Sequence, residues 1–510
     1  MTTLAAVNGV APKLGVVLVA ILAGAALLVA PPRLRATATL GALLLAPVLL
    51  LADIWHSPQL HSVHRHPLLA AVAAVVAVGA VGALAFLITR RGALLGPLLV
   101  LALPFRVPIE AGGTTSNLLV PLYLVVAAGT LAFIVPELAG RRSGERPEGE
   151  APGFAPGWIE RLLALYVLVY AIQSVYSPDF EKALQQMVFF YVPFALLFCL
   201  LRRLQWTPKL VRTCMYVVVG LALVFAAVGF VEYETKTIFL NPKLIAANDV
   251  HTYFTVNSVF FDPDIFGRFL ALVMIGLAVP LLFGRNAREQ IEATVVLAIL
   301  WPALVLTLSR SSLGALLVGL GTLAALRWKA SHTLLVGAAV VAIGAAAILV
   351  SPKTFGLNQG ANNATSGRAN LVSGGIDLFR ARPVWGYGSG SFAHEYSAHH
   401  RNTSLTLSAS HTIAITIAAE QGLIGELAYL AIVVVAAVVL VRGARTDPVR
   451  AGIAAAFVAL VFHTLLYADF LEDPFTWTLL GIGAALAAAA GRASAIVLPP
   501  SADKAHAVPA

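Results

Sequence analysis

Long runs of apolar residues alternate with short polar segments along most of this chain of 510 residues. Several runs approach the roughly 20 residues that an α-helix needs to cross the hydrocarbon core of a bilayer. Examples are residues 14–30, 68–88, 211–231, 266–283 and 422–441. One soluble core could not bury so many runs, so the pattern predicts an all-α polytopic transmembrane bundle of roughly 13–15 spans. Residues 92–105 form a shorter run that is more typical of a re-entrant segment.

The composition indicates the same environment. Hydrophobic residues make up 59% of the chain and charged residues 12%, with a mean hydropathy of +0.86. Soluble domains average about 45–50% apolar and about 25% charged residues. The formal net charge is +9, but the basic residues lie at the ends of apolar runs and form no stripe that would neutralise phosphates. We therefore expect a lipid bilayer, and no nucleic acid, as a partner.

The distribution of Lys and Arg predicts which side of the membrane each loop faces. One alternating set of short loops, together with the C-terminal tail, holds about 20 of the 34 basic residues. These loops are residues 33–35, 90–91, 141–146, 202–212, 285–288, 327–329 and 442–450. Because short loops rich in Lys and Arg stay in the cytoplasm, we expect a multi-pass protein of the cytoplasmic membrane with its C-terminus inside. The side of the N-terminus stays open.

This pattern divides the chain into six segments. They are N-terminal transmembrane helices at 1–136, a cytoplasmic linker at 137–158, central transmembrane helices at 159–350, a large external loop domain at 351–410, C-terminal transmembrane helices at 411–491 and a cytoplasmic tail, expected to be disordered, at 492–510. The central group includes a second external loop at 232–261. Function often lies in loops on a rigid scaffold, so these external loops and the tight external turn 307–312 are candidates.

Two arginines near external helix ends are candidate ligands for an anion. Arg310 lies in a turn of Ser and Thr between two apolar runs. An arginine that merely anchors a helix end is the plain alternative, but the external position favours an anion, with phosphate the natural partner of a guanidinium group. Arg268 lies about one turn into an apolar run. It is either a ligand for the same anion or the partner of Asp262 or Asp264.

The end of the large external loop concentrates further polar residues. Gly386, Gly388 and Gly390 indicate a loop that needs positive φ or close backbone approach, and they follow no strand, so they are no dinucleotide-binding fingerprint. Arg368 precedes them in the same loop. His411 stands where the loop turns into an apolar helix. It is either an interfacial histidine with satisfied hydrogen bonds or a general base that titrates near neutral pH.

Two histidine clusters, at residues 56–66 and 394–400, invite a metal interpretation. Neither has the spacing of a zinc protease, since His394 and His399 are five residues apart rather than four. Neither is accompanied by cysteines or a clear set of carboxylates. We therefore expect no dedicated metal site.

Several of these motifs occur together in one known superfamily. His411 and Thr412, then nine residues, Gly422, two residues and Gly425 have the spacing of an O-antigen ligase motif. Thr412 departs from the Asn, Ser or Gln that usually follows the histidine. The turn at 308–310 and the segments 261–268 and 382–392 precede it in the expected order. On these residues the chain resembles the O-antigen ligase and Wzy-type polymerase superfamily over roughly residues 256–440, whereas the first ~230 residues match only as a generic bundle.

The resemblance implies a GT-C-type glycosyltransferase that uses no metal or other cofactor. Its donor would be a polyprenyl-diphosphate-linked glycan and its acceptor a glycan or glycolipid on the outer face of the membrane. External arginines, here Arg310, Arg368 and Arg268, would hold the diphosphate, and His411 would activate the acceptor hydroxyl. This agrees with elementary chemistry, because a diphosphate leaving group needs charge stabilisation and an attacking hydroxyl needs a base.

Two other classes of protein stay open at this point. A transporter or flippase of lipid-linked sugars would predict internal repeats and charged or broken helices at the membrane midplane; we find no convincing repeat, and the conspicuous charges lie at helix ends. A non-catalytic scaffold of envelope assembly would tolerate loss of His411. Whether the enzyme is a ligase or a polymerase, and which sugars it joins, does not follow from the residues.

Overall fold

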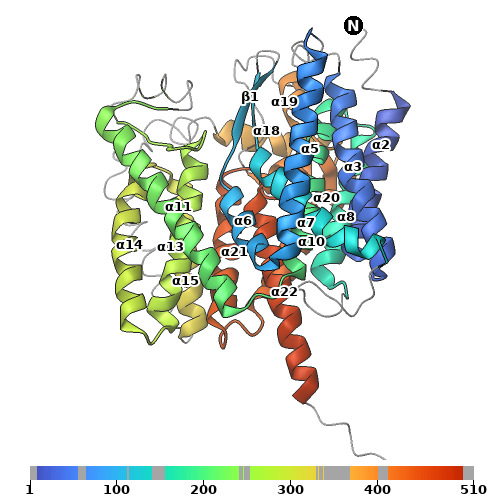
Figure 1. The fold of residues 1–510 in the computed structure, drawn as a ribbon. Helices are drawn as coiled ribbons and strands as arrows, with labels where there is room; N and C mark the ends of the chain where they lie inside the picture. Colours follow the sequence, from blue (N-terminus) through green and yellow to red (C-terminus); the bar gives the residue numbers. More distant parts are fainter. Residues whose placement is uncertain are drawn as a thin grey trace, which may run out of the picture.

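The chain folds as a helical bundle with one short β-hairpin (Figure 1). The computed structural model describes residues 9–55, 65–111, 114–140, 155–239, 253–328, 368–399, 410 and 412–497, together with the isolated positions 245, 248, 331 and 337. The predicted all-α class is confirmed.

Within these residues, eleven helices are long and apolar enough to cross a membrane. They are α2 (Val10–Leu28), α3 (Pro32–Ile54), α5 (Pro67–Arg90), α7 (Val120–Leu138), the continuous segment of α9 (Phe180–Gln186), η3 (Met187–Tyr191) and α10 (Val192–Arg203), α11 (Pro208–Thr235), α13 (Pro263–Phe283), α14 (Ala287–Leu306), α20 (Ile413–Val441), α21 (Pro448–Leu466) and α22 (Pro474–Val497). Two further helices, α8 (Trp158–Ser174) and α15 (Arg310–Arg327), are of nearly the same length. The eleven candidate spans of the described residues are fewer than the roughly 13–15 that the sequence predicted.

The starts of several spans are encoded locally by a capping residue followed by proline. Asp262, Asp447 and Asp473 each accept a hydrogen bond from the amide two residues on, at 2.7–3.0 Å. Thr207 does the same for the amide of Leu210 at 3.3 Å. Proline at the first helical position lacks an amide that would otherwise be unsatisfied, and its fixed φ suits a helix. These positions therefore define where a span begins.

The short apolar run after α5 does not form a full span. It contains η2 (Gly92–Leu94) and α6 (Leu95–Ala102), which at eight residues is only about 12 Å long. The chain then forms β1 (Val107–Ala111) and β2 (Thr114–Leu118), an antiparallel pair in which Val107 faces Leu118.

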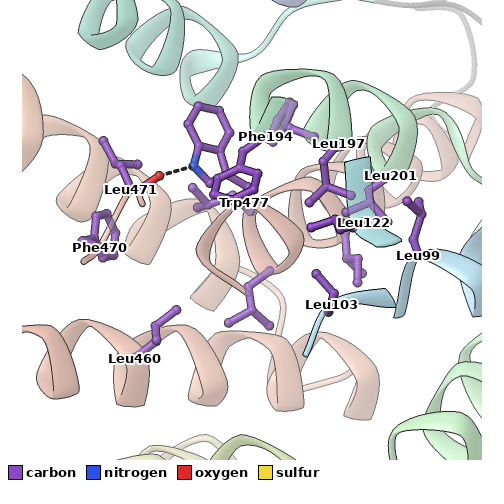
Figure 2. Packing of buried hydrophobic residues seen from close by; sticks show 14 of the residues in the cluster. Leu99, Leu103, Leu122, Phe194, Leu197, Leu201, Leu460, Phe470, Leu471 and Trp477 are labelled. Atoms are coloured by element: carbon purple, nitrogen blue, oxygen red, sulfur yellow. Dashed lines mark hydrogen bonds between the residues drawn. The ribbon is translucent and has the colours of Figure 1, made fainter. Parts of the chain in front are cut away.

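Large apolar side chains fill the centre of the bundle where α10, α21 and α22 meet (Figure 2). Trp477 is fully buried there, and its indole N–H donates a 2.8 Å hydrogen bond to the carbonyl of Leu471. Phe194, Leu197 and Leu460 surround it from the neighbouring helices. This packing anchors the turn between α21 and α22.

One end of the bundle carries α18 (Arg368–Ala381), α19 (Phe392–His399) and the hairpin, whereas α22 ends at the opposite side (Figure 1). The turns 307–309 and 467–473 also lie at the first end. Both contact the first residues of α13, since Ser309 bonds to Asp264 and Asp473 pairs with Arg268. We call the first end the loop end. Among the described residues, the loops rich in Lys and Arg connect the helices at the other end.

Candidate functional site

The transmembrane helix α20 is interrupted at Gly422, and the glycine-rich loop inserts into the interruption. Gly422 has φ +62°, a conformation that favours glycine. Before the kink, the carbonyl of Glu420 accepts a 2.7 Å hydrogen bond from the amide of Gly388. After it, the amide of Leu423 donates to the carbonyl of Pro383 at 2.8 Å. Backbone groups released by the kink are thus satisfied by the loop, as burial requires.

The three loop glycines have positive φ and touch neighbouring backbone, as their pattern predicted. Their φ angles are +65° at Gly386, +107° at Gly388 and +76° at Gly390. A Cβ at Gly386 would lie 2.2 Å from the carbonyl oxygen of Glu420, and one at Gly388 would lie 2.6 Å from the Cα of Ser177. Only glycine permits this approach.

Gly425 has a different role from Gly422. Its φ is not positive, but a Cβ there would lie 2.4 Å from Oε1 of Gln421. The missing side chain makes room for the Gln421 amide, whose Nε2 donates a 3.0 Å hydrogen bond to the hydroxyl of Tyr166. The two glycines of the motif therefore provide a kink and, three residues later, space for a buried amide.

Glu420 connects the kinked helix to α19. Its Oε2 accepts a 2.8 Å hydrogen bond from the amide of Gly390, and its Oε1 accepts one at 3.0 Å from the amide of Phe392. Because Phe392 is the first residue of α19, the carboxylate caps that helix and lies at the positive end of its dipole. These two hydrogen bonds offset part of the cost of burying the Glu420 carboxylate.

A cavity of about 400 Å³ opens at the loop end, beside the contact between α20 and the glycine-rich loop. Its wall is formed by α8, α9, η3, the first turns of α20 and the turn 467–473, with Arg106 and Leu118 from either side of the hairpin. Ile413 also lines it, two residues after His411. The volume lies in the range of small-ligand pockets.

The cavity wall carries charges of both signs. Its basic residues are Arg106 and Lys182, and its acidic residues include Asp469 and Glu472. Oε1 of Glu472 accepts a 2.6 Å hydrogen bond from Nε2 of Gln186, whose own Oε1 accepts from the hydroxyl of Tyr170. The pKa of the Glu472 carboxyl is raised to about 8, mainly because the group is buried and secondly because Asp469 is negatively charged.

Arg310 is the first residue of α15 and is exposed at the loop end. Among the residues described, no hydrogen bond or ion pair involves its guanidinium group. Below it, Ser309 and Ser311 both donate to Oδ1 of Asp264, the latter at 3.0 Å. Oγ of Ser311 also lies 3.2 Å from Nε2 of the buried His463. This hydroxyl network fixes the turn that presents Arg310.

Arg268 is fully buried and pairs with Asp473, not with either of the two aspartates that the sequence suggested. Nη2 lies 3.0 Å from Oδ2 of Asp473, but neither atom has a well-aligned hydrogen bond within the described part of the chain. The guanidinium group therefore retains unused donors. Asp262 instead accepts a 3.1 Å hydrogen bond from the hydroxyl of Tyr467.

The other predicted site residues lie next to the start of α20 and in the loop 351–410. His411 falls outside the described residues, but its neighbours are anchored. Ser410 is buried and its amide donates to Oγ1 of Thr416 at 3.1 Å, and Oγ1 of Thr412 donates to the carbonyl of Leu465 at 3.1 Å. Arg368 is the first residue of α18, and its side chain lies outside the described part.

The structure does not bring all candidates into one cavity. Neither Arg310 nor Arg268 lines it, although the turn 467–473 joins the two regions by contributing Asp473 to Arg268 and Glu472 to the cavity. No cluster of three or more His, Cys, Asp or Glu in the described ranges is arranged to hold a metal ion.

Sequence reasoning missed four charged residues of the cavity, namely Arg106, Lys182, Asp469 and Glu472. Arg106 and Lys182 belong to the set of loops that is poor in basic residues. A basic residue is unusual in that set, and this was the signal that the sequence offered. Asp469 and Glu472 lie in a short turn with no recognisable motif. Only the fold brings that turn against α9.

Comparison with known families agrees with the motif analysis. Residues 294–430 match the family model described as O-Antigen ligase, which covers α15, α18, α19 and the kinked part of α20. A search of curated proteins finds no match. The bundle and this match define a multi-pass membrane protein. Its residues 294–430 are similar to the O-antigen ligase family, as the spacing of His411, Gly422 and Gly425 predicted.

Proposed function

We propose that the protein is a metal-independent membrane glycosyltransferase of the GT-C type. It transfers or polymerises a polyprenyl-diphosphate-linked glycan onto an acceptor sugar at the outer face of the cytoplasmic membrane. The observation that carries this proposal is the cavity beside the start of α20. The part of its wall that α20 contributes lies within residues 294–430, which match the O-antigen ligase family. The loop end then faces outside, where the lipid-linked donor is presented.

In the proposed reaction, His411 is the general base. The acceptor hydroxyl oxygen attacks the anomeric carbon of the donor while its proton passes to His411. The bond between that carbon and the diphosphate oxygen breaks, and the diphosphate leaves on the polyprenyl lipid. A group that titrates near neutral pH is suited to this proton transfer.

The leaving diphosphate requires compensation of its negative charge, and we assign this to Arg310, Arg368 and Arg268. Arg310 is the best supported of the three, because it is exposed at the loop end and has no carboxylate partner in the described residues. Arg268 has donors left over beside Asp473.

Replacing His411 by Ala in cells tests the proposal. We expect lipid-linked glycan to accumulate and surface polymer to disappear, both measured on the same cultures. His394→Ala is the matched control, since His394 is exposed on α19 in the same external loop and should leave the polymer unchanged. Normal polymer in a His411→Ala strain with normal membrane abundance of the protein would contradict the enzyme and favour a scaffold.

A further inference from the structure

The proposed roles of His411 and the arginines leave one wall of the cavity unassigned. That wall consists of Gln186 from α9 and of Asp469 and Glu472 from the turn 467–473. Opposite charges and amides also line the cavity, so the wall belongs to a mixed polar pocket rather than to an isolated acidic patch.

The groups on this wall are held in place by the surrounding structure. Gln186 bridges Tyr170 and Glu472, with a 2.6 Å hydrogen bond to the carboxyl of Glu472. The turn that carries Glu472 is fixed at Leu471 by the indole N–H of Trp477. A polar pocket with fixed side chains binds a ligand with little loss of conformational entropy.

Charge decides which part of a lipid-linked glycan fits this wall. This wall presents carboxyl and amide groups and no guanidinium or ammonium group, so it lacks the cationic donors that a diphosphate requires. Sugar hydroxyls both donate and accept hydrogen bonds, and carboxyl and amide groups supply both functions. Tyr170 and Tyr191, whose ring centroids lie 4.4 Å apart, add apolar surface to the same cavity.

We propose that this cavity is a saccharide subsite in which Glu472, Asp469 and Gln186 hold hydroxyl groups of one sugar unit of the glycan substrate. The inference rests on the proposed transferase function, because it assigns the sugar of that reaction to a place in the fold. The sugar belongs to the donor or to the acceptor, and the two sources share this chemistry.

The kinetic experiment uses the purified full chain in lipid nanodiscs, with donor and acceptor concentrations varied separately. Glu472→Gln and Asp469→Asn each keep the side-chain size, and Asn tolerates the positive φ of +77° at position 469. We expect a rise in one KM of about tenfold or more, with a smaller change in kcat. The KM that rises identifies the source of the sugar. Glu292→Gln, exposed on α14, is the control.

Unchanged KM values for both substrates in both variants would overturn the saccharide subsite. So would weaker inhibition by inorganic diphosphate as the main effect, because it would indicate a phosphate site. Thermal unfolding of each variant separates a folding defect from a binding defect. If Glu472→Gln is unstable, the Asp469→Asn variant provides the same test.

A binding measurement separates this inference from the proposed function. Calorimetry uses the water-soluble glycan released by mild acid from the lipid that accumulates in His411→Ala cells, with no turnover. Weaker binding to Glu472→Gln than to Glu292→Gln supports the subsite whatever residue is the base. Equal binding overturns the subsite and leaves the His411 test of catalysis untouched.

Discussion

The amide of Gly388 donates a 2.7 Å hydrogen bond to the carbonyl of Glu420, two residues before the kink of α20. This contact joins the glycine-rich loop to the transmembrane helix α20 through backbone atoms alone. The same helix begins two residues after His411 and lines the cavity. The loop, the kink and the cavity therefore form one structural unit, and we expect a change in the kink to alter the geometry of the proposed active site.

Gly422→Ala should destabilise this unit. The new Cβ would meet the carbonyl oxygen of Val384 at 2.4 Å and the positive φ would be strained, at a cost of about 1–3 kcal/mol. Thermal unfolding of the purified protein measures the loss. Gly321→Ala, in α15, is the matched control because nothing lies within 4 Å of its Cβ. Equal unfolding temperatures for the two variants would show that the kink carries no strain.

Removing one partner of the Arg268–Asp473 pair should cost about 3–5 kcal/mol, because it leaves a buried charge uncompensated. Arg268→Ala combined with Asp473→Ala should cost less than the sum of the single changes. A double-mutant cycle on unfolding free energies measures the difference. The exposed pair Arg288–Glu292 provides a control cycle, in which solvent screening should leave the two single changes nearly additive. Additive effects at the buried pair would refute the coupling.

Arg310→Lys should impair glycan transfer without changing stability. Lysine keeps the charge but loses the planar fork that binds two phosphate oxygens, so we expect transfer to fall about tenfold or more. Because Arg310 is exposed, the unfolding free energy should change by less than about 0.5 kcal/mol. Arg327→Lys, at the other end of α15, is the control. Full activity of Arg310→Lys would remove the diphosphate assignment.

Glu472→Gln should alter how stability depends on pH. The pKa of Glu472 is raised to about 8, so the folded state binds this proton more tightly than the unfolded chain does. The contribution of the neutral carboxyl is fully present below the ordinary value of 4.5 and is lost as pH rises through about 8. Glutamine has no proton to lose. The free energy of unfolding of the variant should therefore rise relative to that of the wild type as pH increases from 5 to 8.

Unfolding curves recorded across that pH range check this prediction. Glu292→Gln should run parallel to the wild type, because Glu292 is exposed and pairs only at the surface. If Glu472→Gln also runs parallel, the Glu472 carboxyl is ionised at neutral pH, and its interaction with Asp469 does not hold the proton.

The sequence alone determined the features that depend on local pattern. Apolar runs of spanning length predicted α2, α5, α11, α13 and α20, since a bilayer requires about 20 apolar residues per helix. The glycines at 386, 388 and 390 predicted positive φ, because few other residues adopt it. The spacing of His411, Gly422 and Gly425 predicted the family match.

Only the tertiary structure decided which distant residues meet. Arg268 pairs with Asp473, which lies 205 residues away, rather than with the nearby Asp262 or Asp264. Likewise, Gln186 meets Glu472 across 286 residues to form the cavity wall. Hydropathy and spacing describe how one helix behaves in a membrane. Which helix ends converge is set by how all the spans pack together, and no local pattern records it.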